Sequence, residues 1–306
     1  MKKNDKPILL VIGGHGFIGE HLARVAASNW DVWTAGRSSN PAANKSVELD
    51  VRNARRVRAA FDLARPDVVV LLAAVSDIDR CEREPDLARA VNVQGSRNVA
   101  NECARTGARL VYTSSSAVFD GMKHGYREDD PPSPLSVYGR TKLDAERNVA
   151  AAVPSAIILR PALVLGLSSR NDTNALLNRW VALWKAGKSV AALPNEYRNP
   201  VDAGALAAVI LDLGLNRNAA GVYHVGAADS MSRYEIACWT AEALGCPAGS
   251  VIPEIEGSSA RAPRGRDHFL ITDRIRHTCA VPLGTAREAI WRSLGEITEG
   301  SLRAGI

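Results

Sequence analysis

The chain has 306 residues, of which 46% are hydrophobic and 23% charged, with a formal net charge of +5. These are values of a globular protein, and they exclude an intrinsically disordered chain. No run of 18 apolar residues occurs, so we expect no membrane partner. Because acidic and basic residues are interspersed, we expect a solvated mixed surface rather than a nucleic-acid-binding face.

The spacing of cysteines and histidines bears on disulfides, cellular location and metal sites. The five cysteines are odd in number and scattered, and the first residues contain no apolar signal-peptide core. We therefore expect reduced thiols in a cytoplasmic protein. The six histidines show no ligand spacing, so we predict no metal site.

The first half of the chain alternates strand and helix patterns. Apolar runs predict strands at 8–12, 31–35, 47–49, 67–73, 109–114 and 156–159. Helical periodicity lies between them at 17–28, 53–64, 86–105 and 137–151. This order predicts an α/β fold with a Rossmann-type, doubly wound parallel sheet.

The second half is less regular. The proline-rich segment 121–136 predicts a loop, and helices are predicted at 175–186, 203–213, 233–244 and 286–294, with a strand at 222–225. We divide the chain into a dinucleotide-binding Rossmann domain, 1–165, and a smaller substrate-binding lobe, 166–306, partly interleaved with it.

A glycine loop joins the first predicted strand to the first predicted helix. In this loop Gly13, Gly16 and Gly19 are each separated by two residues. The first glycine permits a tight turn, the second lets backbone amides approach a pyrophosphate, and the third permits close helix packing. Together with Phe17 and Ile18 at the helix start, where unpaired N–H groups favour anions, they predict a dinucleotide site.

The end of the second predicted strand carries a cation. Arg37 stands where an NAD-selective site usually places a carboxylate, so we expect it to pair with the 2′-phosphate of NADP. We therefore predict NADP (NADPH) as cofactor, with NAD as the alternative. Asp50 and Val51 end the third strand, where the carboxylate could accept a hydrogen bond from adenine or merely form a turn.

The fourth predicted strand ends in small residues. Leu72, Ala73 and Ala74 leave room for a cofactor to cross the edge of the sheet. Asn92 is a poor helix former inside a predicted helix. It could tie the helix to this strand end beside the cofactor, or lie on the surface.

Tyr138 and Lys142 lie four residues apart on a predicted helix, about 120 residues after the glycine loop. Side chains with this spacing share one helical face. An ammonium beside a phenol favours the phenolate, so we expect the pKa of Tyr138 to fall from roughly 10 toward neutrality. Ser115 and Ser116 follow the fifth strand, and a hydroxyl there could bond a substrate carbonyl.

These motifs resemble the extended branch of the short-chain dehydrogenase/reductase superfamily. Within that branch, 81–85, 118–121, 198–202, 221–224 and 230–234 are similar to stretches of the dTDP-4-dehydrorhamnose reductase-like group. No carboxylate stands at Ser115-Ser116, which argues against sugar-nucleotide 4,6-dehydratases.

The resemblance implies roles for individual residues. Tyr138 would be the general acid, and Lys142 would bond the nicotinamide ribose. Ser115 would face the carbonyl, with Ser116 as the alternative, and Pro161 would border the nicotinamide. We also expect Arg198 in the second lobe to contact a phosphate or sugar.

The activity implied is NADPH-dependent reduction of a keto group on a nucleotide-linked deoxysugar, by an oxidoreductase that relatives suggest is a homodimer. Two alternatives stay open. One is a sugar-nucleotide epimerase that retains NAD, and the other is a non-catalytic NADP-binding regulatory subunit.

Overall fold

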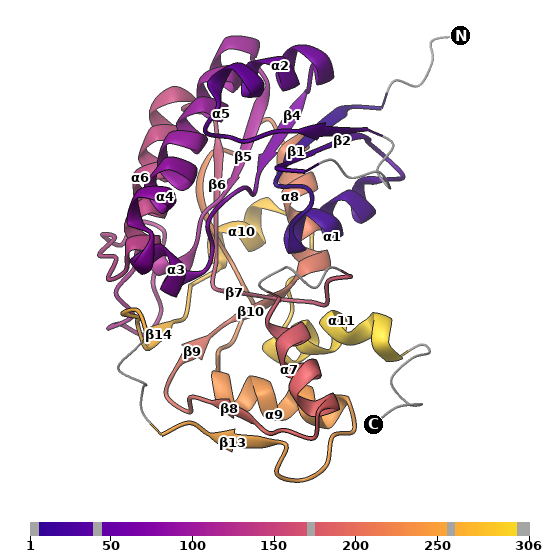
Figure 1. Cartoon of the computed structure of the whole chain (residues 1–306), viewed down its shortest axis with the longest axis vertical. Coiled ribbons are helices and arrows are strands. Elements are labelled where there is room, and N and C mark those ends of the chain that lie inside the picture. The colour runs from indigo at the N-terminus through magenta and orange to yellow at the C-terminus, as the bar shows by residue number, and fades with distance from the viewer. Residues whose placement is uncertain (1–5, 39–44, 170–174, 256–260, 299–306) are drawn as a thin grey trace.

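The computed structural model describes residues 6–38, 45–169, 175–255 and 261–298, with side chains to Gly295. Most of the N-terminal stretch inspected for a signal peptide lies outside these ranges. In Figure 1 a large sheet flanked by helices occupies one end of the molecule, and a smaller group of helices and short strands occupies the other.

The main sheet has seven parallel strands in the order β11-β6-β5-β4-β1-β2-β3, which confirms the predicted fold class. These strands are β1 (Ile8–Ile12), β2 (Asp31–Gly36), β3 (Ser46–Glu48), β4 (Val68–Leu71), β5 (Arg109–Thr113), β6 (Ile157–Pro161) and β11 (Gly221–Val225). The strand order reverses direction between β1 and β4, and ligands of such sheets bind at the strand ends near this point.

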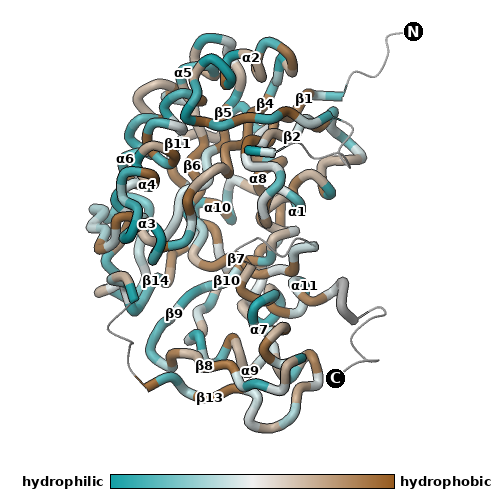
Figure 2. The backbone as a smooth tube through the Cα atoms, viewed as in Figure 1, coloured by the Kyte–Doolittle hydropathy of each residue, from teal (hydrophilic) through white to brown (hydrophobic). Residues whose placement is uncertain are grey.

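Helices cover both faces of this sheet, and each face has its own apolar core. One face carries α1 (Phe17–Ala26) and α8 (Ala203–Leu215), and the other carries α2 (Ala54–Ala64), α5 (Ser96–Thr106) and α6 (Val137–Ala152). The central strands are apolar on both sides because both are buried, and Figure 2 shows them brown beneath more polar outer helices.

The second half of the chain builds the smaller end and also returns to the main sheet. Its remaining elements are β7 (Leu163–Leu165), α7 (Leu176–Lys185), β8 (Val190–Ala192), β9 (Tyr197–Arg198), β10 (Pro200–Asp202), β12 (Met231–Ser232), α9 (Arg233–Ala243), β13 (Val251–Pro253), β14 (Asp267–His268), α10 (Asp273–Thr278) and α11 (Ala286–Thr298). A third apolar cluster joins α7, α9 and α11 to β8 and β13. Strand β11 pairs with β6, so residues from both halves form one sheet.

Local sequence signals fix several helix boundaries. Asn53 begins α2, and its side chain accepts from the backbone N–H of Arg55 and Arg56. Gly107 closes α5 in the left-handed conformation, at φ 76°.

The prediction of one continuous helix over 86–105 is wrong in detail. The segment consists of α4 (Pro85–Ala88), a π-helical stretch (Arg89–Gly95) and α5, and a further helix, α3 (Ile78–Arg83), precedes it. Within the segment the hydroxyl of Ser96 donates to the carbonyls of Asn92 (2.5 Å) and Val93 (3.0 Å). Side-chain donors of this kind compete with the regular backbone ladder, and π-helical turns often occur at functional sites.

The π-helical stretch orients Asn92 toward the end of β4. Its carbonyl oxygen accepts from the N–H of Val75 at 2.8 Å, and its amide donates to the carbonyl of Val75 at 3.1 Å. The same amide donates to the hydroxyl of Thr141 on α6 at 3.0 Å. One buried side chain therefore links the loop after β4 to α6.

We expect Asn92→Ala to lower the free energy of unfolding by about 1–3 kcal/mol, because it leaves buried polar groups of the 75-loop and α6 unpaired. Chemical denaturation measures this change. Asn101→Ala, at an exposed position on α5, is the matched control and should change stability by less than about 0.5 kcal/mol. Equal effects of the two substitutions would contradict the linking role of Asn92.

Candidate active site

A short turn after β5 places the predicted serines. Ser115 is extended and precedes a 3₁₀ turn (Ser116–Val118), and its Oγ accepts from the N–H of Ala117 at 3.2 Å. Helix α6 begins beside this turn, where the hydroxyl oxygen of Ser136 accepts from the N–H of Gly139 at 3.1 Å. Both segments are therefore fixed by serine caps.

Gly139 lets α6 lie directly against the turn. A Cβ atom at this position would collide with the carbonyl oxygen of Ala117. The close approach brings the neighbouring Tyr138 to Ser115, and the two side chains are hydrogen bonded. Two residues predicted to act together thus meet, although 23 positions separate them in the sequence.

Lys142 lies on the same face of α6 and is only 3% exposed. Its Nζ donates to the carbonyl of Thr113 at 2.6 Å and lies 4.3 Å from the centre of the Tyr112 ring. Burial lowers the pKa of Lys142 to about 7, against the opposing effect of Glu146. The ammonium is therefore held at the end of β5, beside the residues of the 3₁₀ turn.

The structure differs from expectation in the direction of the Tyr138 pKa. Burial raises it to about 12, and the hydrogen bond with Ser115 opposes this rise. The ammonium of Lys142 bonds a backbone carbonyl instead of the phenol. At neutral pH Tyr138 is thus a protonated phenol, which is the form a proton donor requires.

A cavity of about 90 Å³ opens at Ser115 and Ser116 and is also lined by Arg198. The main-chain carbonyl of Ser116 accepts from Nδ1 of His268 at 2.9 Å, and Ser116 is 3% exposed. Ser115 is the serine that bonds Tyr138. This arrangement favours Ser115 over Ser116 as the hydroxyl that meets a substrate carbonyl.

Arg198 supports the wall of this cavity through its backbone contacts. Its guanidinium donates to the carbonyls of Tyr197 (2.7 Å), Arg266 (3.0 Å) and Gly265 (3.1 Å). These bonds fix the segment before β14 against β9. Arg198 therefore lines the same cavity as Ser115, with most of its donors already used by the chain.

Sequence reasoning missed the rest of the cavity wall. Ile78 on α3 and the segment containing Pro263, Arg264 and His268 also line it. Asp79 holds the two parts together, since its carboxylate accepts from the guanidinium of Arg264 at 2.8 Å. No local pattern marks these residues, because they meet only through contacts across nearly 190 positions.

His268 in this wall is neutral and its tautomer is defined. Burial lowers its pKa to about 3. Because the carbonyl of Ser116 can only accept, Nδ1 carries the proton, and Nε2 is an acceptor.

The glycine loop has the geometry of a phosphate cradle. Gly13 has φ 93°, and a Cβ there would lie 2.6 Å from the nitrogen of Ala73. A Cβ at Gly19 would lie 2.5 Å from the carbonyl oxygen of Gly13. Gly16 is different, since its Cβ would meet only that oxygen at 3.4 Å, and its φ of −89° suits any residue. The fold requires glycine at 13 and 19, whereas open space at 16 fits an approaching phosphate group.

The remaining residues predicted to bind the cofactor surround this cradle. Phe17 and Ile18 are the first residues of α1. The N–H groups of Leu72 and Ala73 donate to the carbonyl of Ile12 at 2.8 and 3.0 Å, which places the small residues up to Ala74 beside the loop. These residues fit a dinucleotide whose phosphates meet the start of α1.

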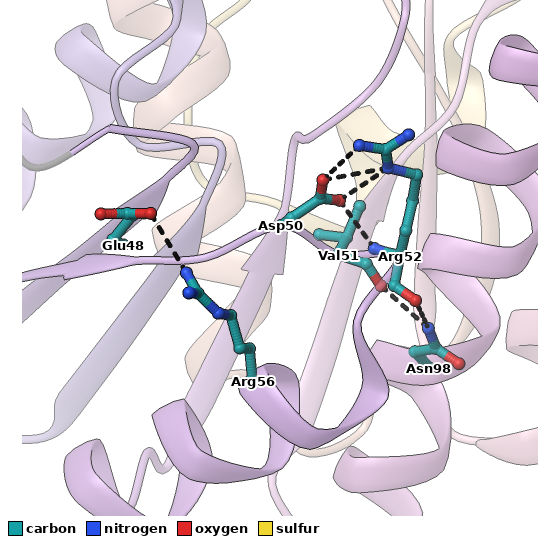
Figure 3. A network of polar contacts seen from close by, with 6 residues as sticks. All are labelled: Glu48, Asp50, Val51, Arg52, Arg56 and Asn98. Atoms are coloured by element: carbon teal, nitrogen blue, oxygen red, sulfur yellow. Dashed lines mark hydrogen bonds and ion pairs between the residues drawn. The ribbon is translucent and has the colours of Figure 1, made fainter.

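A second, open depression lies at the ends of β2 and β3. It brings Arg37 and Asp50 together, and its other lining residues are Glu48, Arg52, Asn53, Ala54, Arg55 and Arg56. The carboxylate of Asp50 accepts from Arg52, as Figure 3 shows, and these bonds, aided by the charge of Arg37, lower its pKa. Four arginines against two carboxylates make this depression cationic, which fits a ribose phosphate.

Val51, Asn92 and Pro161 support the strand ends. The carbonyl of Val51 accepts from the amide of Asn98 on α5 at 2.9 Å (Figure 3). Asn92 is fully engaged by protein groups, and Pro161 ends β6 as a buried residue.

Within the described ranges, no cluster of three or more His, Cys, Asp or Glu side chains is arranged to hold a metal ion. Among the helices described there, none has the length and apolar character needed to cross a bilayer.

A glycine cradle at the reversal of a doubly wound sheet, with a Ser–Tyr–Lys set one strand away, defines the class of short-chain dehydrogenases/reductases. The chain belongs to the family described as the RmlD substrate binding domain, whose sequence model matches residues 7–299. This confirms the resemblance inferred from the motifs.

Named relatives fall into two groups. The chain is 31% identical over 260 residues to "Methionine adenosyltransferase 2 subunit beta" of Xenopus tropicalis, covering 83% of this chain and 77% of that one. It is 30% identical over 301 residues to dTDP-4-dehydrorhamnose reductase of Mycolicibacterium smegmatis, covering 96% and 88%. The crystal structure of dTDP-4-dehydrorhamnose reductase from Bacillus anthracis in complex with NADP has the same fold, with a TM-score of 0.85, 24% identity, and coverage of 96% and 100%.

We expect Gly16→Ala and Gly19→Ala to separate ligand binding from folding. Gly19→Ala should lower the free energy of unfolding by about 1–3 kcal/mol through its backbone clash. Gly16→Ala should change it by less than about 0.5 kcal/mol, yet weaken dinucleotide affinity about tenfold or more. Thermal unfolding and cofactor titration measure the two effects. A Gly16 variant with normal affinity would contradict the cradle.

Proposed function

We propose that this protein is an NADPH-dependent reductase of a keto group on a nucleotide-linked deoxysugar. The observation that carries the proposal is the hydrogen bond of Tyr138 with Ser115, a serine that lines a cavity together with Arg198. Membership of the family and the names of the reductase relatives support it.

The chain would hold the cofactor along the ends of its strands. The cradle at Gly13, Gly16 and Gly19 would bind the pyrophosphate, and Arg37 would pair with the 2′-phosphate. Lys142 would bond the nicotinamide ribose. When bound, NADPH supplies the hydride that reduces the carbonyl carbon.

Residues of the chain then neutralise and stabilise the negative charge that forms on the carbonyl oxygen. Tyr138, protonated at neutral pH, delivers its proton to that oxygen, and Ser115 donates a hydrogen bond to it. Lys142 stabilises the phenolate left behind. A positioned general acid of this type contributes roughly 10² to 10⁴ in rate, and the cavity between the two halves fixes the sugar beside it.

Further features complete the proposal. The segment 166–306 contributes the substrate-binding lobe, partly interleaved with the Rossmann domain of 1–165. The five free cysteines suit a reducing, cytoplasmic location. A homodimer is expected by analogy with relatives, and light scattering in solution tests it.

A second candidate, a subunit that binds NADP without chemistry, is favoured by one observation. Several relatives that are 30–32% identical are named as a subunit of methionine adenosyltransferase 2. The intact Ser–Tyr–Lys set supports the reductase instead, because binding alone does not require a proton donor bonded to Ser115. An epimerase that retains NAD is the third possibility, and it would show bound NAD without net cofactor turnover.

We expect Tyr138→Phe to lower kcat about a hundredfold or more and to leave NADPH affinity within about threefold, because the change removes only the transferable proton. Absorbance at the nicotinamide band, with a panel of nucleotide-linked keto sugars, measures turnover. The matched control is Tyr234→Phe on α9, whose hydroxyl bonds Cys238. Normal turnover of Tyr138→Phe would remove this phenol from the mechanism, and no turnover by the unaltered protein would favour the subunit.

We expect Arg37→Ala to weaken NADPH binding about tenfold or more and to change NADH binding less than threefold, since only NADPH carries the 2′-phosphate. Titration with each dinucleotide measures both constants. Arg58→Ala, on α2 but outside the cationic depression, is the control. Equal losses for the two cofactors would contradict the NADP assignment.

A further inference from the structure

A buried ion pair lies one helical turn after Lys142, where a residue of α6 meets a residue of β6. Glu146 follows Lys142 by four residues on α6, and its carboxylate accepts two hydrogen bonds from Arg160 on β6, at 2.9 and 2.6 Å. Glu146 is 5% exposed and Arg160 is 3% exposed. A buried pair of this kind costs desolvation energy and is weak evidence for a purely stabilising role.

The pair contacts the wall of the candidate active site through Phe119. The guanidinium of Arg160 stacks on the ring of Phe119, 5.1 Å from its centre, and Phe119 lines the cavity. Nη1 of Arg160 and the hydroxyl of Tyr112 are buried without a hydrogen-bond partner among the described residues. Such unsatisfied groups are expensive, so a compensating functional role is expected.

Few groups near Lys142 could stabilise its positive charge. The groups that face it are Glu146 on its own helix, the thiol of Cys81 on α3, and the ring of Tyr112 and the carbonyl of Thr113 on β5. Glu146 is the carboxylate among these groups, and it is paired with Arg160. One helical turn separates it from Lys142, so their side chains lie on the same face.

We propose that Glu146, held in place by Arg160, is a positioning residue whose negative charge keeps Lys142 protonated in the active site. The expected effect on activity rests on the proposed function. The expected effect of Glu146 on the charge of Lys142 does not. Burial alone drives Lys142 toward the neutral amine, and its pKa of about 7 lies at neutral pH. Loss of the carboxylate would then leave a neutral amine, which cannot stabilise a phenolate.

The first test is the pH profile of kcat/KM for Glu146→Gln. We expect the loss of activity at high pH to begin about one pH unit lower than in the unaltered protein, because the charge that favours the ammonium is gone. Asp144→Asn removes an exposed carboxylate from the same helix and should leave the profile unchanged. A structural role for Glu146 would lower activity equally at all pH values.

Glu146→Gln leaves Arg160 buried and uncompensated, which could prevent folding. The double variant Glu146→Gln/Arg160→Met removes both charges with little change of volume and should fold. We expect it to show the same acidic shift of about one pH unit, because the negative charge is still missing. A normal profile in the double variant would overturn the proposal.

A second readout needs no activity and so separates this inference from the proposed function. Since the folded pKa of Lys142 (about 7) lies below its unfolded value of 10.5, the unfolded chain binds one more proton between these pH values. Stability therefore rises with pH across this window, up to tenfold per pH unit in the folding equilibrium constant.

In the ligand-free double variant this rise should begin about one pH unit lower, and in Lys142→Met it should disappear. Chemical denaturation between pH 6 and 9 measures it, with Asp144→Asn as reference. If the double variant and the reference give parallel curves, Glu146 does not act on Lys142. If the curves shift but no turnover is found, the inference holds and the reductase assignment fails.

Discussion

The active site depends on one backbone contact, the approach of α6 to the carbonyl of Ala117 at Gly139. The 3₁₀ turn on one side is fixed by the cap of Ser115, and the start of α6 is held by Glu82, whose carboxylate accepts from the N–H of Val137 at 2.6 Å. A larger residue at Gly139 would move the helix, and with it Tyr138, away from Ser115. Because proton transfer requires hydrogen-bond distance, this spacing controls the chemistry more strongly than any property of the phenol itself.

The same close packing explains the electrostatics of the site. A helix that lies on the strand end buries Lys142 and leaves Tyr138 half-buried. Burial shifts their pKa values in opposite directions, up for the phenol and down for the ammonium. Both shifts favour the neutral forms. A neutral phenol suits a proton donor, whereas a neutral amine does not suit a group that must stabilise the phenolate. The buried pair of Glu146 and Arg160 is placed where it corrects the second shift without changing the first.

The sequence predicted the parts of the structure that depend on local patterns. Continuous apolar runs such as β4 identify buried parallel strands, and the spacing of Tyr138 and Lys142 places both on one helix face. It did not predict the π-helical stretch at 89–95. That stretch is accompanied by a bond within the helix, from Ser96 to the carbonyl of Asn92, and by a bond from Asn92 to Val75 in a distant loop, and the second cannot be read from local spacing. The cavity wall at 263–268 was also missed, and so was the rise in the Tyr138 pKa, since burial cannot be read from spacing.

Dinucleotide binding and proton transfer are built from different strands in this fold. The cradle and the cationic depression lie at the ends of β1, β2 and β3, and depend largely on backbone geometry and on Arg37. The proposed proton donor lies on α6 beside the end of β5, and depends on Ser115 and Tyr138. The relatives include proteins named as reductases and proteins named as subunits. In such a fold a substitution at the second place can leave the first intact. This chain has the residues of both places, and the proposed effect of Glu146 on Lys142 matters for catalysis only where the second place transfers a proton.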